Sequence, residues 1–206
     1  MISVFVKHLF PRFVLERNLR LTYTFCLGGL AFTSFLVLTV TGLLLLFYYR
    51  PSPGAAYESI LYLESSVWGG AYIRSLHRLS SHTLLVLVAL HTLRVIWTGA
   101  YRPPREFNWI VGVILLFLVV AQAYTGVLLP LDQTAWWATQ TGTELIRTLP
   151  FGEGLRTLLV PDMVGGPLSL IRFYAFHIAI LPIATLSLSM LHFFTIRKQR
   201  GLLPYL

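Results

Sequence analysis

SLHRLSSHTLLVLVALH, residues 75–91, is the stretch that decides the fold of this chain. It is apolar enough for the interior of a membrane, yet it carries three histidines, His77, His82 and His91, together with Arg78. Ionisable side chains inside a hydrophobic segment are costly and usually serve a function. The remaining sequence must therefore explain what these side chains bind or contact.

The composition of the 206-residue chain places this stretch in a bilayer. Hydrophobic residues make up 56% of the chain and charged residues only 12%, whereas soluble domains average about 25% charged residues. A membrane helix needs about 20 apolar residues, and four such helices are expected over residues 21–49, 73–98, 107–130 and 169–196. The predicted fold is all-α, an integral membrane four-helix bundle.

The charges of the connecting segments predict how this bundle is oriented. With four spans, both termini and the link between the second and third spans lie on one side. The basic residues of these three segments are Lys7, Arg12, Arg17, Arg20, Arg102, Arg105, Arg197, Lys198 and Arg200, against Glu16 and Glu106. The positive-inside rule then puts both termini on the cytoplasmic side or its equivalent, the n side, with the p side opposite. The net charge of +8 therefore indicates topology, and no nucleic-acid partner is expected.

Three parts are expected along the chain. Residues 1–20 form a basic, partly amphipathic lead-in on the n-side membrane surface, residues 21–200 the four-helix domain, and residues 201–206 a C-terminal tail. The longest link, residues 131–168, lies on the p side. Its segment QTAWWATQTGTELIRTL, residues 133–149, is expected to be helical, and a long structured loop on one face is usually functional.

The histidines form two pairs at two depths of the predicted bundle. His77 and His91 are 14 residues apart, which leaves them within roughly 40° of one helix face and about 21 Å apart. His177 and His192 are 15 residues apart on the last span, about 60° off one face. Both spans run from the p side to the n side, so His77 is level with His177 and His91 with His192. A pair of facing imidazoles can hold an iron porphyrin from both sides.

Glycines repeat the spacing of the histidines on the other two spans. Gly28 and Gly42 are 14 residues apart on the first span, as are Gly112 and Gly126 on the third. A porphyrin edge between helices needs positions without a side chain, although membrane glycines usually mark close helix packing. A lone membrane histidine is likewise more often a packing or relay residue, and zinc would need three or four ligands close together. The matched pairs favour two haems over these alternatives.

Other candidate residues are assigned by position. Arg74, Arg78 and Arg94 lie near the ends of the second span and are candidate partners for haem propionates. His82 has no mate at the same spacing and is expected to make a packing, surface or loop contact. Cys26 is the one cysteine, so an intrachain disulfide and a CxxCH haem-attachment motif are both excluded.

From Leu21 to Arg200 the sequence resembles the b6 type of cytochrome b, the four-helix subunit of cytochrome b6f and related bc complexes. The 15-residue histidine spacing of the last span also matches the b6 type. The motifs that carry the resemblance are FCLGG (25–29), TGLLLLFYYRP (41–51), IRSLHR (73–78), HTLRV (91–95), TGAYRPPREFNWIVGV (98–113), TGVLLPLDQ (125–133), IRFYAFH (171–177) and LHFFTIRKQ (191–199).

The resemblance implies roles for individual residues. His77 and His177 correspond to the ligands of the p-side haem b, and His91 and His192 to those of the n-side haem b. Cys26 corresponds to the cysteine that holds a third, c-type haem by a single thioether bond. The positions that correspond to haem-packing glycines are Gly28, Gly42, Gly112 and Gly126. Arg74, Arg78 and Arg94 correspond to propionate partners, and Arg197 and Lys198 to the n-side quinone region.

The resemblance also implies the activity. The chain would be a cytochrome b subunit of a quinol:cytochrome c or plastocyanin oxidoreductase, carrying electrons from p-side quinol oxidation to an n-side quinone site in a Q-cycle. Its partners would be a three-helix chain with a Pro-Glu-Trp-Tyr motif, a Rieske iron–sulfur protein, a c-type cytochrome and a second copy of the complex. Its location would be a bacterial inner membrane or a thylakoid-type membrane.

The sequence departs from the family pattern in three places, and a second class of protein remains open. Leu131 stands where the family usually has an aromatic residue, residues 141–168 align poorly, and His82 replaces an apolar residue. The alternative is a dihaem membrane anchor that conducts electrons for a hydrogenase-like or formate-dehydrogenase-like complex. Such anchors lack FCLGG and the paired glycines.

Overall fold

The computed structural model describes residues 25–198, so the predicted lead-in (1–20) and tail (201–206) lie outside the described residues. The chain forms helices throughout this range, without a strand. The elements are α3 (Leu27–Leu46), α4 (Ala56–Ser66), α5 (Gly70–Trp97), α6 (Glu106–Leu128), α7 (Gln133–Arg147), α8 (Gly152–Leu159), α9 (Pro167–Ala175), the π-helical turn η2 (Phe176–Ile180) and α10 (Leu181–Lys198).

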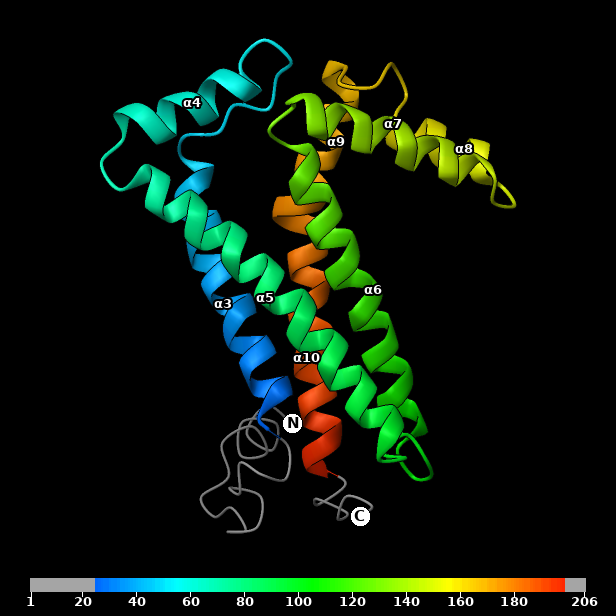
Figure 1. The fold of residues 1–206 in the computed structure, drawn as a ribbon. Coiled ribbons are helices and arrows are strands. Elements are labelled where there is room, and N and C mark those ends of the chain that lie inside the picture. Colours follow the sequence, from blue (N-terminus) through cyan, green and yellow to red (C-terminus); the bar gives the residue numbers. More distant parts are fainter. Residues whose placement is uncertain (1–24, 199–206) are drawn as a thin grey trace, which may run out of the picture.

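Four helices are long and apolar enough to cross a membrane, and the predicted all-α four-span fold is confirmed. They are α3, α5, α6 and the continuous run of α9, η2 and α10, and they lie side by side along the long direction of the molecule (Figure 1). The start of α3, the end of α10 and the link between α5 and α6 share one end. Helices α4, α7 and α8 lie across the other end. Which membrane side each end faces remains a prediction.

Helix α4 is an element that the sequence patterns did not predict. It occupies the link that follows Pro51, Pro53 and Gly54. Ser59 and Leu63 are buried on its inner face. Its docking depends on Gly70 at the start of α5, because a Cβ there would lie 2.0 Å from the Leu63 carbonyl oxygen. This close approach explains why the Gly69-Gly70 pair directly precedes the second span.

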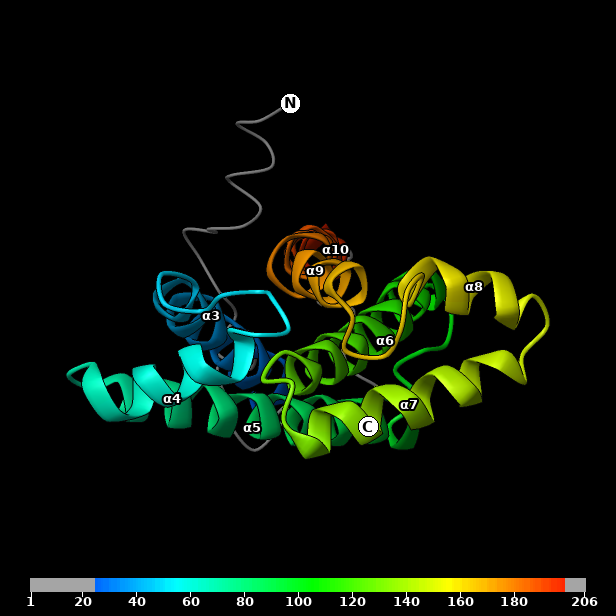
Figure 2. The same cartoon turned by 90° about the horizontal axis from the view of Figure 1, so that it is seen from above.

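The four spans bury little of their surface against one another. Helix α3 packs mainly on α5, and α6 on α10, around a small core that includes Phe35, Leu84 and Val119. Viewed along the bundle, the spans form an open group with α7 and α8 extending to one side (Figure 2). Large apolar side chains such as Phe117, 69% exposed, point outward. In a membrane protein such side chains face lipid or partner helices.

The predicted helix at residues 133–149 is α7, and specific contacts fix it across the end of the bundle. Its first turn is capped by Asp132, whose Oδ1 accepts a hydrogen bond of 2.8 Å from the Ala135 N–H. The Tyr124 hydroxyl on α6 donates to the Ala138 carbonyl at 2.9 Å. At the far end, Arg147 donates to Glu153 of α8 at 2.9 Å. Helices α7 and α8 therefore form one layer attached to α6.

Asp162 organises the chain where this layer returns to the last span. Its carboxylate accepts hydrogen bonds from the backbone N–H groups of Leu168 and Ser169, at 2.9 and 3.2 Å, and from the Ser169 hydroxyl. Burial acts to raise the pKa of Asp162, but these hydrogen bonds outweigh it and lower the pKa below its ordinary value. The carboxylate thereby caps the start of α9.

We predict that this cap fails in acid. A carboxyl with a lowered pKa in the folded state stabilises the fold above its unfolded pKa, and this contribution is lost as the pH falls through the folded pKa. Limited proteolysis of the segment before α9 should therefore accelerate below about pH 4. In Asp162→Ala the segment should already be cleaved quickly at pH 7, with little further change in acid. Equal cleavage of both proteins at pH 7 would contradict the assignment.

Candidate bis-histidine site

Two of the predicted histidines meet inside the bundle at the end nearer α4 and α7. His77 comes from α5 and His177 from η2, and their ring centroids lie 6.4 Å apart with an angle of 71° between the ring planes. A metal about 2 Å from one nitrogen of each ring, with each ring centre about 1 Å farther back, needs a separation of about 6 Å. The rings are therefore spaced as two axial ligands of a single metal would be.

Hydrogen bonds assign the tautomers of these two imidazoles. Thr41 on α3 donates its hydroxyl to the Val37 carbonyl at 2.8 Å, so it accepts from His77 Nδ1, also at 2.8 Å. His177 Nδ1 lies 3.1 Å from the backbone carbonyl of Gln122, which can only accept. In neutral imidazole a proton on Nδ1 leaves Nε2 unprotonated. Both rings therefore keep Nε2 available as a metal ligand.

Each of the four histidines packs against one predicted glycine on a facing helix. A Cβ at the glycine would lie 2.7–3.4 Å from the imidazole Cε1, which is tighter than ordinary van der Waals contact. The pairs are Gly28 with His91 at 3.3 Å, Gly42 with His77 at 3.3 Å, Gly112 with His192 at 3.4 Å and Gly126 with His177 at 2.7 Å. The glycine spacing thus follows the histidine spacing, at two levels and on two helices.

The second pair, His91 and His192, lies toward the end where α3 begins. The two imidazoles pack against glycines of facing helices, His91 against Gly28 and His192 against Gly112. His192 Nδ1 is buried without a hydrogen-bond partner among residues 25–198. His192 therefore differs from His77 and His177 in how its imidazole is held.

The 15-residue spacing on the last span is explained by η2. The Leu181 N–H donates to the Phe176 carbonyl, five residues back, instead of the four of an α-helix. One such turn absorbs one extra residue, so His177 and His192 are related like residues 14 apart in a regular helix. This gives the two histidines the same offset as His77 and His91, roughly 40°, whereas regular α-helical geometry gave an offset of about 60°.

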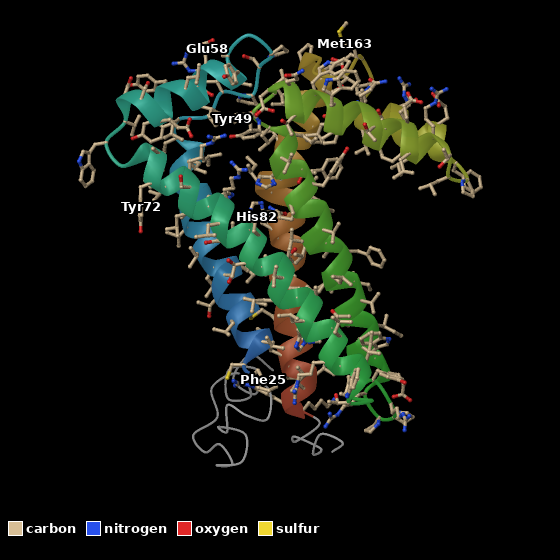
Figure 3. All side chains as sticks on the ribbon, viewed as in Figure 1. Phe25, Tyr49, Glu58, Tyr72, His82 and Met163 are labelled. Atoms are coloured by element: carbon tan, nitrogen blue, oxygen red, sulfur yellow. The ribbon has the colours of Figure 1, made fainter. Side chains whose placement is uncertain are left out.

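The remaining candidate residues lie at the two ends of the bundle. Arg74 is near the start of α5 and pairs with Glu64 of α4, while Arg78 is exposed one turn later. Arg94 is near the other end of α5, with its guanidinium 5.2 Å from the centre of the Phe25 ring. Phe25 marks that end in Figure 3.

Cys26 and two basic residues share this end with Arg94. Cys26 is exposed beside Phe25 at the start of α3. Arg197 and Lys198 are exposed in the last turn of α10. His82 is exposed on the middle of α5, outside both pairs (Figure 3).

Sequence reasoning missed the side chains that hold the imidazoles. Thr41 and Thr125 both precede a paired glycine, and Thr125 Oγ1 lies 3.2 Å from His177 Nδ1. The repeated Thr-Gly dipeptide, at 41–42 and 125–126, is a signal that could have found them. Gln122 lies one helical turn before Gly126, and no spacing rule singles it out.

The residues present fit haem better than a clustered metal site. Among residues 25–198, no group of three or more His, Cys, Asp or Glu side chains could hold a metal ion. Paired imidazoles with free Nε2 atoms, between helices without side chains at the contact, suit a planar ring with two axial ligands. Fold and site together define an integral membrane protein of the bis-histidine four-helix class.

Comparison with known proteins identifies the family. The family described as Cytochrome b/b6/petB matches residues 14–200, and the chain belongs to it. Cytochrome b6 of Heliomicrobium gestii is 43% identical over 176 residues, 85% of this chain and 83% of that protein. The menaquinol:cytochrome c reductase cytochrome b subunit of Bacillus subtilis is 41% identical over 180 residues, 86% of this chain and 80% of that protein.

A solved structure shares the fold. A chain of a structure described as hyperthermophilic respiratory Complex III superposes with a TM-score of 0.79 at 28% identity, over 85% of this chain. The match spans 48% of that chain, so the present chain corresponds to about half of its length.

We predict that Gly126→Ala disturbs this site and Gly29→Ala does not. The new Cβ at residue 126 would meet a hydrogen-bonded imidazole at 2.7 Å, and such overpacking costs about 1–3 kcal/mol. At Gly29 nothing lies within 4 Å, so alanine should be neutral or slightly stabilising. Thermal unfolding of the detergent-solubilised protein compares the two variants. Equal midpoints would argue against the glycine–imidazole contact.

Proposed function

We propose that this chain is the cytochrome b subunit of a quinol:cytochrome c or plastocyanin oxidoreductase, with one haem b at each histidine level. In this function it carries electrons from quinol oxidised on the p side to quinone on the n side. The observation that carries the proposal is the matching of four imidazoles with four glycines at two depths. The names of the Bacillus subtilis relative and of the Complex III structure support it. The alternative of a hydrogenase-type or formate-dehydrogenase-type anchor has no comparable support.

The protein residues would bind, orient and insulate the cofactors. His77 with His177, and His91 with His192, would hold the two groups through imidazole nitrogens, and the facing glycines would leave space beside these rings. Haem supplies reversible one-electron oxidation and reduction when bound. The surrounding apolar helices exclude water. Arg74, Arg78 and Arg94 are placed near the ends of α5, where propionate carboxylates at a membrane protein's polar boundary need cations.

Cys26 is proposed to hold a third, c-type haem by one thioether bond. Its thiol is exposed at the start of α3, two residues before Gly28, which packs on His91. It therefore lies near the level of the second histidine pair and is open to a reactant from outside the bundle. Arg197 and Lys198, exposed at the same end, are proposed to supply positive charge to the n-side quinone region.

The rest of the surface leaves room for the proposed partners. Residues 21–200 would act as one cytochrome b domain, with the α7–α8 layer as the p-side surface near quinol oxidation. A three-helix chain with a Pro-Glu-Trp-Tyr motif, a Rieske protein, a c-type cytochrome, lipid and a second copy of the complex are the proposed partners. The largely exposed apolar faces of the spans are suited to lipid and to partner helices. The membrane would be a bacterial inner membrane or a thylakoid-type membrane.

We predict that the two histidine levels lose haem separately. In the purified complex, His177→Leu should remove the haem at the first level and His192→Leu the one at the second, because a bis-histidine site fails without either ligand. His82→Leu is the matched control, since this histidine is exposed on α5. Pyridine haemochrome analysis counts the haems. Wild-type protein without haem, or equal loss in the control, would contradict the proposal.

We predict that covalently bound haem depends on Cys26. After acid–acetone extraction of the separated wild-type chain, one haem should stay with the polypeptide. In Cys26→Ser nothing should stay, because a hydroxyl cannot form the thioether. The extractable b haems should be unchanged. No retained haem in the wild type would remove the third haem and leave a dihaem subunit.

A further inference from the structure

The last span contains a proline at an unusual place. Pro182 is the second residue of α10, directly after η2, and lies well inside the membrane-length run Pro167–Lys198. A proline inside a helix has no N–H to donate to an earlier carbonyl. Inside a membrane, a backbone carbonyl left without a donor is costly because no water can replace it. The affected carbonyl must therefore accept a hydrogen bond from a donor outside its own helix.

The π-helical turn decides which carbonyl is affected. Because the Leu181 N–H donates to Phe176, five residues back, the next bond in that register would run from residue 182 to the His177 carbonyl. Residue 182 is proline, so this bond cannot form. The Leu181 N–H, which would serve His177 in an α-helix, is already used. The carbonyl of a proposed haem ligand thus loses both of its helical donors.

Gln122 of α6 supplies the missing donor. Its side-chain Nε2 donates to the His177 backbone carbonyl at 2.8 Å, and its own backbone carbonyl accepts from His177 Nδ1 at 3.1 Å. One residue therefore contacts the ligand at both backbone and ring. The amide is deep enough that its Oε1 is buried without a hydrogen-bond partner in the described part of the chain, so its donor function is the one that the structure uses.

We propose that Gln122 is a positioning residue for His177, which holds the proline-interrupted π turn and thereby sets the orientation of this imidazole against His77. The inference rests on the proposed function, in which His177 is a haem ligand. The side chain acts on the ligand's backbone, and Gln122's own backbone carbonyl fixes the ring nitrogen. Without the side-chain amide, the turn would rotate to find another donor, and the 71° angle between the two rings would change.

The test compares Gln122→Leu with Gln133→Leu in the purified complex. Gln133 is exposed at the start of α7 and serves as the matched control. Electron paramagnetic resonance of the oxidised protein reports the angle between two axial imidazole planes through the low-field g value of each haem. In Gln122→Leu we expect the g value of the His77–His177 haem to shift, while that of the His91–His192 haem stays unchanged. Transfer of this haem to apomyoglobin should be about tenfold faster.

A second variant gives a rescue. Pro182→Ala restores an N–H at the position that the π register calls for, so the double variant Gln122→Leu/Pro182→Ala should regain the wild-type g value and slow haem transfer. If Gln122→Leu alone does not assemble with haem, regained assembly in the double variant supports the same conclusion. An unchanged g value in Gln122→Leu, or a double variant no better than the single one, would overturn the proposal.

The two proposals fail in distinguishable ways. If wild-type protein shows no bis-histidine haem signal, the proposed function fails, whatever Gln122 does. If wild-type protein shows both signals and Gln122→Leu gives the same g values as Gln133→Leu, the positioning role fails and the haem assignment stands.

Discussion

The contact between each buried imidazole and a glycine on a facing helix is the constraint on which this structure depends. Four ionisable rings lie inside an apolar bundle, and a Cβ on each facing glycine would lie only 2.7–3.4 Å from the imidazole Cε1. Glycine at those positions sets how near α3 can come to α5 and α6 to α10. The spans bury few of their own side chains, so the glycine–imidazole contacts are a large part of what joins them.

Irregular backbone at one ligand completes this arrangement. In an uninterrupted α-helix, His177 and His192 would have a different offset from that of His77 and His91. The π-helical turn Phe176–Ile180 changes the register by one residue, and Pro182 lies two residues after it. The irregularity exposes a carbonyl, which a side chain from α6 then satisfies. The π-helical turn, Pro182 and the Gln122 side-chain amide together determine the backbone hydrogen bonding around His177.

Much of this could be predicted from sequence because the controlling patterns are simple. Apolar length identified the four spans, and equal spacings paired His77 with His177 and matched glycines with histidines. What could not be predicted depends on three-dimensional contacts. Gln122 has no mate at a fixed spacing, and its function appears only when α6 lies beside η2. The histidine spacing did not indicate the π turn, because a rotation of about 100° per residue describes only a regular α-helix.

The end regions were less predictable for a different reason. Helix α4 is short and lies between Pro51, Pro53 and Gly54 on one side and Gly69-Gly70 on the other, and no helix was predicted there. It forms because Leu63 can approach Gly70 at the start of α5. By contrast, α7 was expected, and its buried residues Ala135, Thr139 and Thr143 recur every four positions, as in an amphipathic helix. A packing contact thus marks the first helix, whereas the sequence pattern already indicated the second.

The hydrogen bonds of His77 and His177 differ from those of His192, and this difference changes how basic each imidazole is as a ligand. His77 and His177 give their Nδ1 protons to acceptors, whereas His192 Nδ1 finds none within residues 25–198. An imidazole that shares its proton is the more basic ligand, and a more basic ligand favours the ferric over the ferrous state of iron. In the proposed dihaem subunit, His77 and His177 would therefore favour the ferric state more than His192 would.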